Sequence, residues 1–167
     1  MHRVRITQPF YMGIYEVTQA QYESVMGENP SRFRDPQAPV EGVSWENATA
    51  FCRKLSELSG FEVRLPSEAE WEYACRAGKN LPYGADRSIS PRSLNYASCP
   101  LNTKGTWSRD SYRAKTVKVD SYRPNAWGLY HMQGNVWEWC NDWYGKDAYA
   151  GGERADPGGP EKGKYRV

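Results

Sequence analysis

Apolar positions in three segments recur at the spacing of short amphipathic helices. The longest segment lies between Ser44, a candidate N-cap, and Gly60, a candidate C-cap. Its apolar residues fall three or four positions apart, which places them on one face of a helix. They are Ala48, Phe51, Leu55 and Leu58. The pattern therefore predicts a helix between the two caps.

Two further helices are predicted by capping boxes, in which a Ser or Thr and a Glu or Gln three residues later bind each other's backbone N–H groups. Thr18 with Gln21 is one such pair, and Ser67 with Glu70 is the other. The expected helix ends are Gly27 and Gly78. The side chains expected to face the core are Tyr22, Val25, Met26, Trp71, Ala74 and Cys75.

Three stretches alternate apolar and polar residues, which is the pattern of a strand with one buried face. They are residues 3–7, 61–65 and 116–120. In the second, one face would carry Phe61, Val63 and Leu65. The fold class predicted is α+β, a single domain over residues 1–167 with three short helices, short strands and long loops.

Residues 79–113 are polar and show no helical or strand periodicity. A stretch of that length without elements is usually functional or stabilised by an ion. It contains Asn95, Asn102 and Asp110, whose side-chain oxygens are of the kind that hard cations prefer. We expect an ion to stabilise this loop; the alternative is that these side chains are simply solvated.

Residues 134–144 contain three tryptophans, including Trp137 and Trp139. Because these two are two positions apart, an extended segment would point both to one face. The opposite face would carry Val136, Glu138 and Cys140. A carboxylate is costly to bury unless it is paired or bound to a cation. Either this is a core strand with one exposed acid, or Glu138 has a defined role.

Composition excludes several classes of protein. The 22 Lys and Arg nearly balance the 20 Asp and Glu, and no basic stripe interleaved with aromatics suggests nucleic-acid binding. No apolar run approaches the length of a membrane span. The first residues lack a signal-peptide pattern, so a cytoplasmic location is the default expectation.

The cysteines and histidines do not form a recognisable metal motif. The four cysteines are more than twenty residues apart and form neither a CxxC motif nor a zinc knuckle. Two disulfides are possible, but free buried thiols are favoured because no secretion signal is visible. With only His2 and His131 present, no triad of histidines can bind a metal, and His131 is expected to be packed or hydrogen-bonded.

The segment Gly134-Asn135-Val136-Trp137-Glu138-Trp139 resembles the signature of the formylglycine-generating enzyme/sulfatase-modifying factor family. Further segments match that family in the same order. They are residues 16–22, 39–45, 64–74 and 125–130. The resemblance implies a C-type-lectin-like fold of the formylglycine-generating type, with little regular secondary structure.

The resemblance also implies an activity. The family oxidises a cysteine in the CxPxR motif of a sulfatase to formylglycine, using molecular oxygen and copper(I) held by two cysteine thiolates. Those cysteines follow an Arg-Val-x-x-Gly-Gly-Ser motif, which would begin near the last residues of this sequence. We therefore expect a domain shortened at both ends, which lacks the cysteine pair and is inactive as given. Copper is expected only if a C-terminal segment supplies that pair.

Two calcium sites are implied by the same resemblance. One would use His131, the carbonyls of Gly134 and Val136, and Glu138. In it, His131 replaces the usual Asn or Asp, and imidazole is a poor calcium ligand. The other would use Asn95, the Tyr96 carbonyl, Asp110 and the Tyr112 carbonyl. Trp137 and Trp139 would be part of the core or of a substrate groove wall.

The sequence leaves two functions open. One is an oxidase domain whose partner is a sulfatase-type cysteine peptide. The other is a non-catalytic binding module, or a regulatory domain of a larger protein, whose partner is a protein or peptide. Neither nucleic acid nor membrane is an expected partner.

Overall fold

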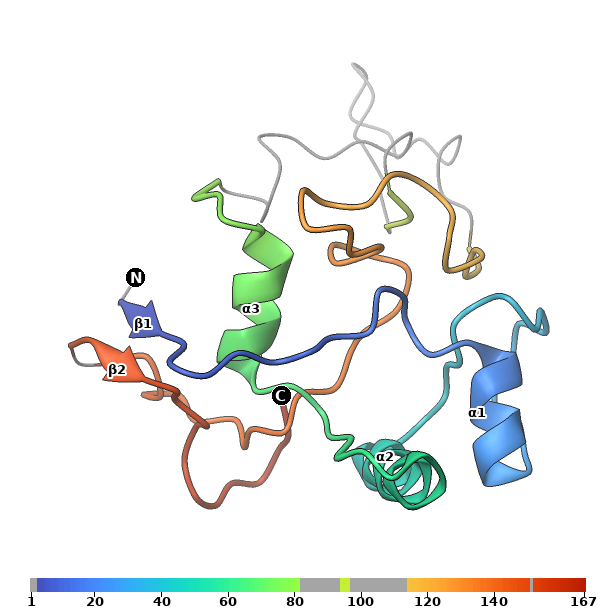
Figure 1. Cartoon of the computed structure of the whole chain (residues 1–167), viewed down its shortest axis with the longest axis horizontal. Coiled ribbons are helices and arrows are strands. Elements are labelled where there is room, and N and C mark those ends of the chain that lie inside the picture. The colour runs from blue at the N-terminus through green and yellow to red at the C-terminus, as the bar shows by residue number, and fades with distance from the viewer. Residues whose placement is uncertain (1–2, 82–93, 97–113, 151) are drawn as a thin grey trace, which may run out of the picture.

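In the part of the chain that the structure describes, three short helices are connected by long irregular segments (Figure 1). The computed structural model describes residues 3–81, 94–96, 114–150 and 152–167. The helices are α1 (Gln19–Met26), α2 (Trp45–Ser59) and α3 (Glu68–Arg76). The strands are β1 (Val4–Arg5) and β2 (Arg154–Ala155). Within the described ranges, no helix is long and apolar enough to cross a membrane.

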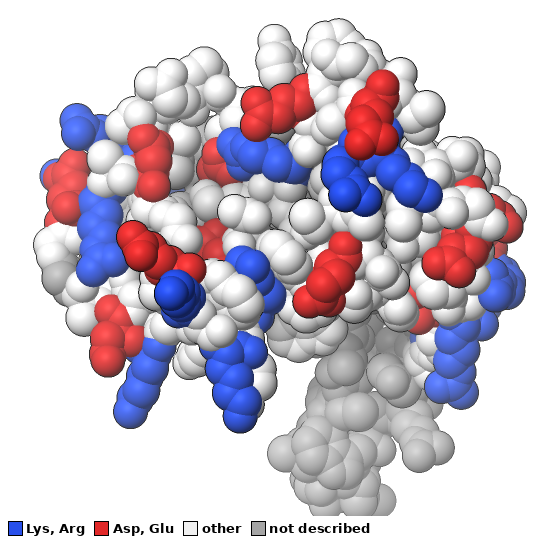
Figure 2. Space-filling view, turned by 90° about the horizontal axis from the view of Figure 1, so that it is seen from below, with Lys and Arg blue, Asp and Glu red and all other residues white. Residues whose placement is uncertain are grey.

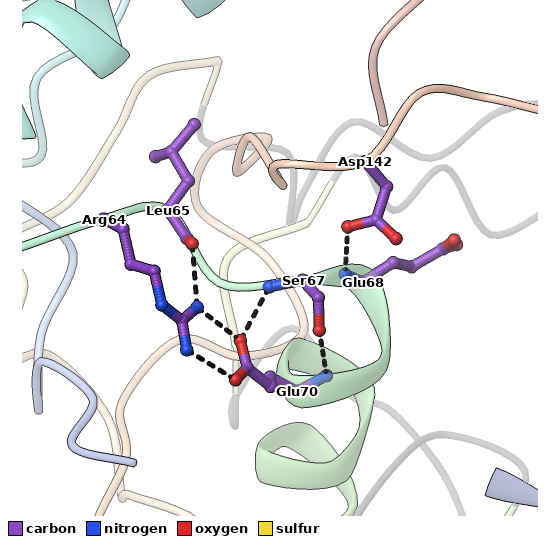
Figure 3. Close-up of polar contacts among 6 residues, drawn as sticks. All are labelled: Arg64, Leu65, Ser67, Glu68, Glu70 and Asp142. Atoms are coloured by element: carbon purple, nitrogen blue, oxygen red, sulfur yellow. Dashed lines mark hydrogen bonds and ion pairs between the residues drawn. The ribbon is translucent and has the colours of Figure 1, made fainter. Parts of the chain in front are cut away.

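Both predicted capping boxes are present. At α1, the Thr18 hydroxyl accepts the Gln21 N–H (3.2 Å), and the Gln21 side chain accepts the Thr18 N–H (2.9 Å). At α3, Ser67 and Glu70 exchange the corresponding bonds (Figure 3). Arg64 adds two hydrogen bonds of 2.7 Å to the Glu70 carboxylate. The sequence therefore located both helix starts correctly.

The helix ends are confirmed except at α3. Gly27 and Gly60 occupy the left-handed region, with φ of 83° and 75°, as C-caps of α1 and α2. The cap of α3 is Ala77, with φ of 46°, and the predicted Gly78 follows it. A left-handed alanine costs roughly 1–2 kcal/mol. The buried side chain of Ala77 is consistent with packing that compensates for this cost.

Only one of the three predicted strands is present. β1 pairs in parallel with β2, with Val4 opposite Arg154, but both residues of β1 are exposed instead of half-buried. Residues 61–65 and 116–120 are irregular. Ser56 binds both backbone groups of Val63, and the Val117 N–H binds Asn135, so these backbones find partners outside a sheet.

The described residues form two core clusters. The first lies between α1 and α2, where the rings of Tyr22 and Phe51 stack 5.4 Å apart. The second packs α3 against residues 129–132, and its buried members are Ala74, Cys75, Leu129 and Met132. Two predicted core residues face solvent instead, because Leu58 is 72% exposed and Phe61 is 77% exposed. Leu58 lies in the last turn of α2, and Phe61 follows its C-cap, Gly60.

Charged side chains of both signs are interspersed on the face shown in Figure 2. This mixture agrees with the near balance of charges in the sequence. A nucleic-acid-binding face normally concentrates one sign of charge. The part of the surface in view therefore has no such concentration.

Candidate functional site

Within the tryptophan-rich segment, the side chains of residues 137–140 alternate between more and less exposed, as predicted. Trp137 is fully exposed (101%) and Trp139 is 38% exposed, whereas Cys140 is buried. The Trp139 indole N–H donates to the Val43 carbonyl (2.9 Å), which fixes its ring against the start of α2. Trp137 is therefore not part of the core. The two indoles form an outward-facing aromatic edge, which we call the Trp137–Trp139 edge.

Glu138 points inward from the same segment. Its carboxylate accepts the indole N–H of Trp71, on α3, at 2.5 Å. Burial raises the pKa of Glu138, and the hydrogen bond from Trp71 opposes that shift. Glu138 is therefore an internal, hydrogen-bonded acid and not an exposed one.

A second acid, Glu16, is partly buried and lies within electrostatic range of Glu138. One carboxylate oxygen of Glu16 accepts the Asn135 side-chain amide (2.7 Å), while the other is buried without a hydrogen-bond partner. Burial raises the pKa of Glu16 to about 8; the Asn135 bond opposes the shift and the charge of Glu138 adds to it. Sequence reasoning missed Glu16 as a site residue, although it begins one of the matching segments.

Asn135 ties three distant segments together. Its side chain accepts the Val117 N–H (2.9 Å) and an Asn95 amide hydrogen (3.1 Å), and it donates to Glu16. Its backbone N–H donates to the Asn95 carbonyl (2.7 Å). The same carbonyl would lie 2.4 Å from a Cβ at position 134, so Gly134 permits this approach.

All four residues of the first predicted calcium site lie in the described part of the chain. Gly134, Val136 and Glu138 share one segment, and one buried carboxylate oxygen of Glu16 has no hydrogen-bond partner. The His131 ring has partners of its own. Its Nε2 contacts the Lys118 carbonyl (3.2 Å), and its ring stands edge-on to Tyr122. Burial lowers the pKa of His131, which favours the neutral imidazole.

Half of the second predicted calcium site can be located. The Asn95 amide group donates to the Lys115 carbonyl (3.0 Å) and to Asn135, which leaves its side-chain oxygen to act as an acceptor. Tyr96 follows it in the chain, while Asp110 and Tyr112 lie outside the described residues. Across the described ranges, no group of three or more His, Cys, Asp or Glu side chains is arranged to hold a metal ion.

Three cysteines are buried free thiols, as expected: Cys52, Cys75 and Cys140. Burial raises the pKa of the Cys75 thiol to about 11 and that of Cys140 to about 12. Cys52 packs between α1 and α2, whereas Cys75 belongs to the cluster around α3. The raised pKa values keep the thiols of Cys75 and Cys140 protonated near neutral pH. Cys99 lies outside the described residues.

Residues that follow the signature are anchored to α2 and to residues 166–167. The Arg166 guanidinium lies 3.7 Å from the ring centre of Trp45 and 3.5 Å from that of Trp143. The Cys140 N–H donates to the Val167 carbonyl, and the Trp45 indole donates to the Cys140 carbonyl. These contacts fix the tryptophan-rich segment in position.

Asp142 connects the signature to the start of α3 (Figure 3). Its carboxylate, which is buried, accepts the Glu68 N–H at 2.9 Å. Free N–H groups and the positive end of the helix dipole favour an anion at this position. The contact therefore orients α3 relative to the segment that carries Glu138.

A protein-family model matches the whole chain. The family model for the sulfatase-modifying factor enzyme 1-like domain matches residues 1–167. The formylglycine-generating enzyme of Bos taurus is 36% identical over 149 residues, which are 84% of this chain and 36% of that protein. The Streptomyces coelicolor enzyme is 40% identical over 139 residues, 79% of this chain and 41% of that protein. The chain thus spans less than half of the length of these relatives.

Relatives with other names also match. A serine/threonine-protein kinase, pkn1 of Chlamydia pneumoniae, is 39% identical over 132 residues, which are 77% of this chain and 18% of that kinase. Among solved structures, Treponema denticola variable protein 1 aligns with a TM-score of 0.77 and 29% identity, covering 93% of this chain and 70% of that chain.

PvdO from Pseudomonas aeruginosa aligns with a TM-score of 0.69 and 26% identity, over 96% of this chain and 67% of that chain. These alignments confirm the α+β fold of the formylglycine-generating type that the sequence predicted. The matched segments and the full-length family match agree. The chain belongs to the sulfatase-modifying factor family, to which the formylglycine-generating enzymes also belong.

Proposed function

We propose that this chain is a peptide-binding domain of the sulfatase-modifying factor family and that it contacts its partner through the Trp137–Trp139 edge. The observation that carries the proposal is the full exposure of the Trp137 side chain. Tryptophan is enriched at the energetic centres of protein interfaces because it offers a large apolar area at a low entropic cost. An indole held outward by a fixed segment is therefore suited to contact a partner.

The proposed partner is an extended peptide of the sulfatase type, which contains a CxPxR motif. The two indoles are two residues apart, which is also the spacing of side chains on one face of an extended peptide. The arginine of such a peptide can stack on an indole face. We also propose that residues 1–167 form a single domain, because the family match spans the same residues.

The described thiols support binding without oxidation. Copper(I) chemistry in this family depends on two thiolates, whereas Cys52, Cys75 and Cys140 are buried and burial raises the pKa of each thiol. We assign no oxidative step to them. The described residues are therefore proposed to position a peptide instead of oxidising it.

Identity with curated formylglycine-generating enzymes favours a second candidate, an oxidase that converts the peptide cysteine to formylglycine. That identity is 36% and 40% for the two enzymes compared above. In this case, the thiolates would be supplied by residues other than the three described cysteines. The same aromatic edge would then present the substrate.

Calcium is the proposed structural ion of the signature. Glu138, the carbonyls of Gly134 and Val136, and the unpartnered carboxylate oxygen of Glu16 offer the hard oxygen ligands that calcium prefers. A bound cation would offset the cost of two buried carboxylates in proximity. For the second site, Asn95 and the Tyr96 carbonyl remain proposed ligands, together with Asp110 and the Tyr112 carbonyl.

A binding measurement tests the first candidate. Fluorescence anisotropy of a labelled CxPxR peptide should show saturable binding to the chain, and Trp137→Ala should weaken it about tenfold, which is typical for loss of a central aromatic contact. Phe61→Ala, which removes another exposed ring, is the matched control. Absence of binding, or equal losses in both variants, would remove the proposal.

Mass spectrometry separates the two candidates. After incubation of the peptide with the chain, copper and oxygen, the peptide-binding proposal predicts an unchanged cysteine. A formylglycine aldehyde in the peptide would establish the oxidase instead. A peptide with Ser in place of Cys serves as the control because it binds without being a substrate for this oxidation.

A further inference from the structure

A cavity of about 220 Å³ lies between the C-terminal end of α3 and residues 122–133. Its floor is formed by Cys75, Leu129 and Met132, which are buried members of the cluster around α3. Its rim carries the exposed side chains of Lys79 and Arg123. The cavity therefore combines an apolar floor with a cationic rim.

The two rim cations differ from paired cations elsewhere on α3 and its flanks. Arg64 pairs with Glu70, and Arg76 pairs with Glu72. Among the described residues, neither Lys79 nor Arg123 has an ion-pair partner, and no Asp or Glu belongs to the lining of the cavity. Two unpaired positive charges at one opening create a potential that attracts an anion.

The negative end of the α3 dipole opposes this attraction, since Cys75 belongs to the last turn of that helix. The opposition is limited because the Ala77 and Lys79 N–H groups bind carbonyls of that turn. Two full charges on Lys79 and Arg123 also exceed the partial charge of a helix end. Lys79 and Arg123 are therefore the charges placed at the opening itself, whereas Glu72, Glu138 and Asp120 act on the floor and wall from outside the described lining.

The cavity is held in shape by hydrogen bonds. The Asn125 side chain donates to the Ala74 carbonyl (2.9 Å) and accepts N–H groups of Trp127 and Leu129, which fixes the turn against α3. One wall consists of Tyr122 and His131, whose rings meet edge-on at 5.8 Å. A cavity held in this way can bind a ligand with little rearrangement.

Size and chemistry together define the ligand. The volume is below the range of roughly 300–1,000 Å³ typical for drug-sized ligands, so a fragment-sized molecule fits. The floor requires an apolar body, and the thiol of Cys75 donates to the Met132 carbonyl (3.2 Å), which satisfies its polar hydrogen. The planar guanidinium of Arg123 matches a carboxylate through two parallel hydrogen bonds.

We propose that this cavity binds a small aromatic or short-chain carboxylate, with its apolar body on the floor and its carboxylate at Lys79 and Arg123. This site is separate from the Trp137–Trp139 edge, and it stands or falls independently of the peptide-binding function. A free inorganic anion would use only the rim.

Benzoate is the test ligand, with benzamide as its neutral counterpart and inorganic phosphate as an anion without an apolar body. In an amide-detected NMR titration of the full chain at low salt, benzoate should saturably shift resonances of residues 122–133. Lys79→Gln and Arg123→Gln should each weaken binding about threefold to fivefold, as expected for loss of one solvent-exposed charge contact. Arg53→Gln and Lys146→Gln remove exposed charges elsewhere and should leave it unchanged.

A blocking variant tests the floor separately from the charges. Ala126 is an exposed member of the lining, so Ala126→Trp should obstruct the cavity and abolish benzoate binding without disturbing the core, which circular dichroism would verify. Equal affinity for benzoate and benzamide, equal losses in the control variants, or absence of saturable shifts would overturn the proposal. Phosphate binding as tightly as benzoate would overturn the role of the apolar floor.

Discussion

The indole N–H of Trp71 donates to the carboxylate of Glu138, a residue 67 positions later in the chain. The bond joins α3 to the tryptophan-rich segment, and the charge of Glu138 reaches a second acid, Glu16, one of whose carboxylate oxygens is buried without a hydrogen-bond partner. Two carboxylates brought into a protein interior favour either a proton or a cation between them.

Glu138→Gln should abolish the stabilisation by calcium while retaining an acceptor for Trp71. At a calcium concentration of about 100 times Kd, binding stabilises the native state by about 2.7 kcal/mol. This corresponds to a rise in Tm of about 5–10 °C for a chain of this size. Thermal melts in calcium and in chelator would measure it.

Glu16→Gln should reduce the same calcium response, because its unpartnered oxygen is a proposed ligand. Glu57→Gln, which changes an exposed acid on α2, is the control. If Glu138→Gln lowers Tm equally in calcium and in chelator, then Glu138 is only a structural acid.

Gly134→Ala should destabilise the fold by about 3 kcal/mol, at the upper end for overpacking, because its Cβ would lie 2.4 Å from the backbone oxygen of Asn95. Urea unfolding would give the loss. Gly158→Ala is the matched control, since nothing lies within 4 Å of a Cβ there. A loss below 0.5 kcal/mol at Gly134 would contradict the close approach of the two segments.

Stability should fall in acid through Glu70. Hydrogen bonds from Arg64 hold the pKa of Glu70 below its usual value of 4.5. A carboxyl whose folded pKa is depressed stabilises the protein above its unfolded pKa, and this contribution disappears as pH falls through the folded pKa. Glu70→Gln should therefore cost about 1–2 kcal/mol at pH 7 and progressively less toward low pH.

Urea denaturation of the wild type and of Glu70→Gln, from pH 7 toward low pH, would show their free energies of unfolding converging. Glu72→Gln removes a more exposed partner of Arg76 and should change stability by no more than about 0.5 kcal/mol. A difference between wild type and Glu70→Gln that stays constant with pH would exclude the assigned role of the carboxylate.

The buried thiols should react slowly with a disulfide reagent. The pKa of Cys75 is raised to about 11 from an ordinary 9.0, so its thiolate fraction falls about 100-fold, and burial slows access further. A Cys99→Ser variant confines the measurement to the three described cysteines. Reaction rates in native buffer and in denaturant provide the comparison, and fast native labelling would favour an accessible thiol site.

Features set by neighbouring residues were predictable from the sequence. The two capping boxes and two of the three glycine caps depend on contacts within a few positions, and they form as predicted. The alternation of Trp137 and Trp139 with Glu138 also follows from the geometry of an extended chain. The absence of strands at residues 61–65 was not predictable, because the Ser56 side chain binds both backbone groups of Val63 there.

The candidate site was less predictable because its contacts are distant in sequence. The partner of Glu138 is Trp71 on α3, and Glu16 is 119 positions from Asn135. No local pattern indicates that these residues meet. His131 was assigned by its spacing from Gly134, whereas its position is determined by the Lys118 carbonyl and the ring of Tyr122.

The alternating signature separates two kinds of evolutionary constraint. Asn135 and Glu138 make internal hydrogen bonds, and Gly134 permits a close backbone approach. A substitution at any of these three positions would therefore affect folding first. Trp137 contacts solvent over its whole side chain, so a substitution there would affect the affinity for the partner first. A lineage can therefore exchange one binding partner for another through the outward positions while the inward ones keep the same architecture.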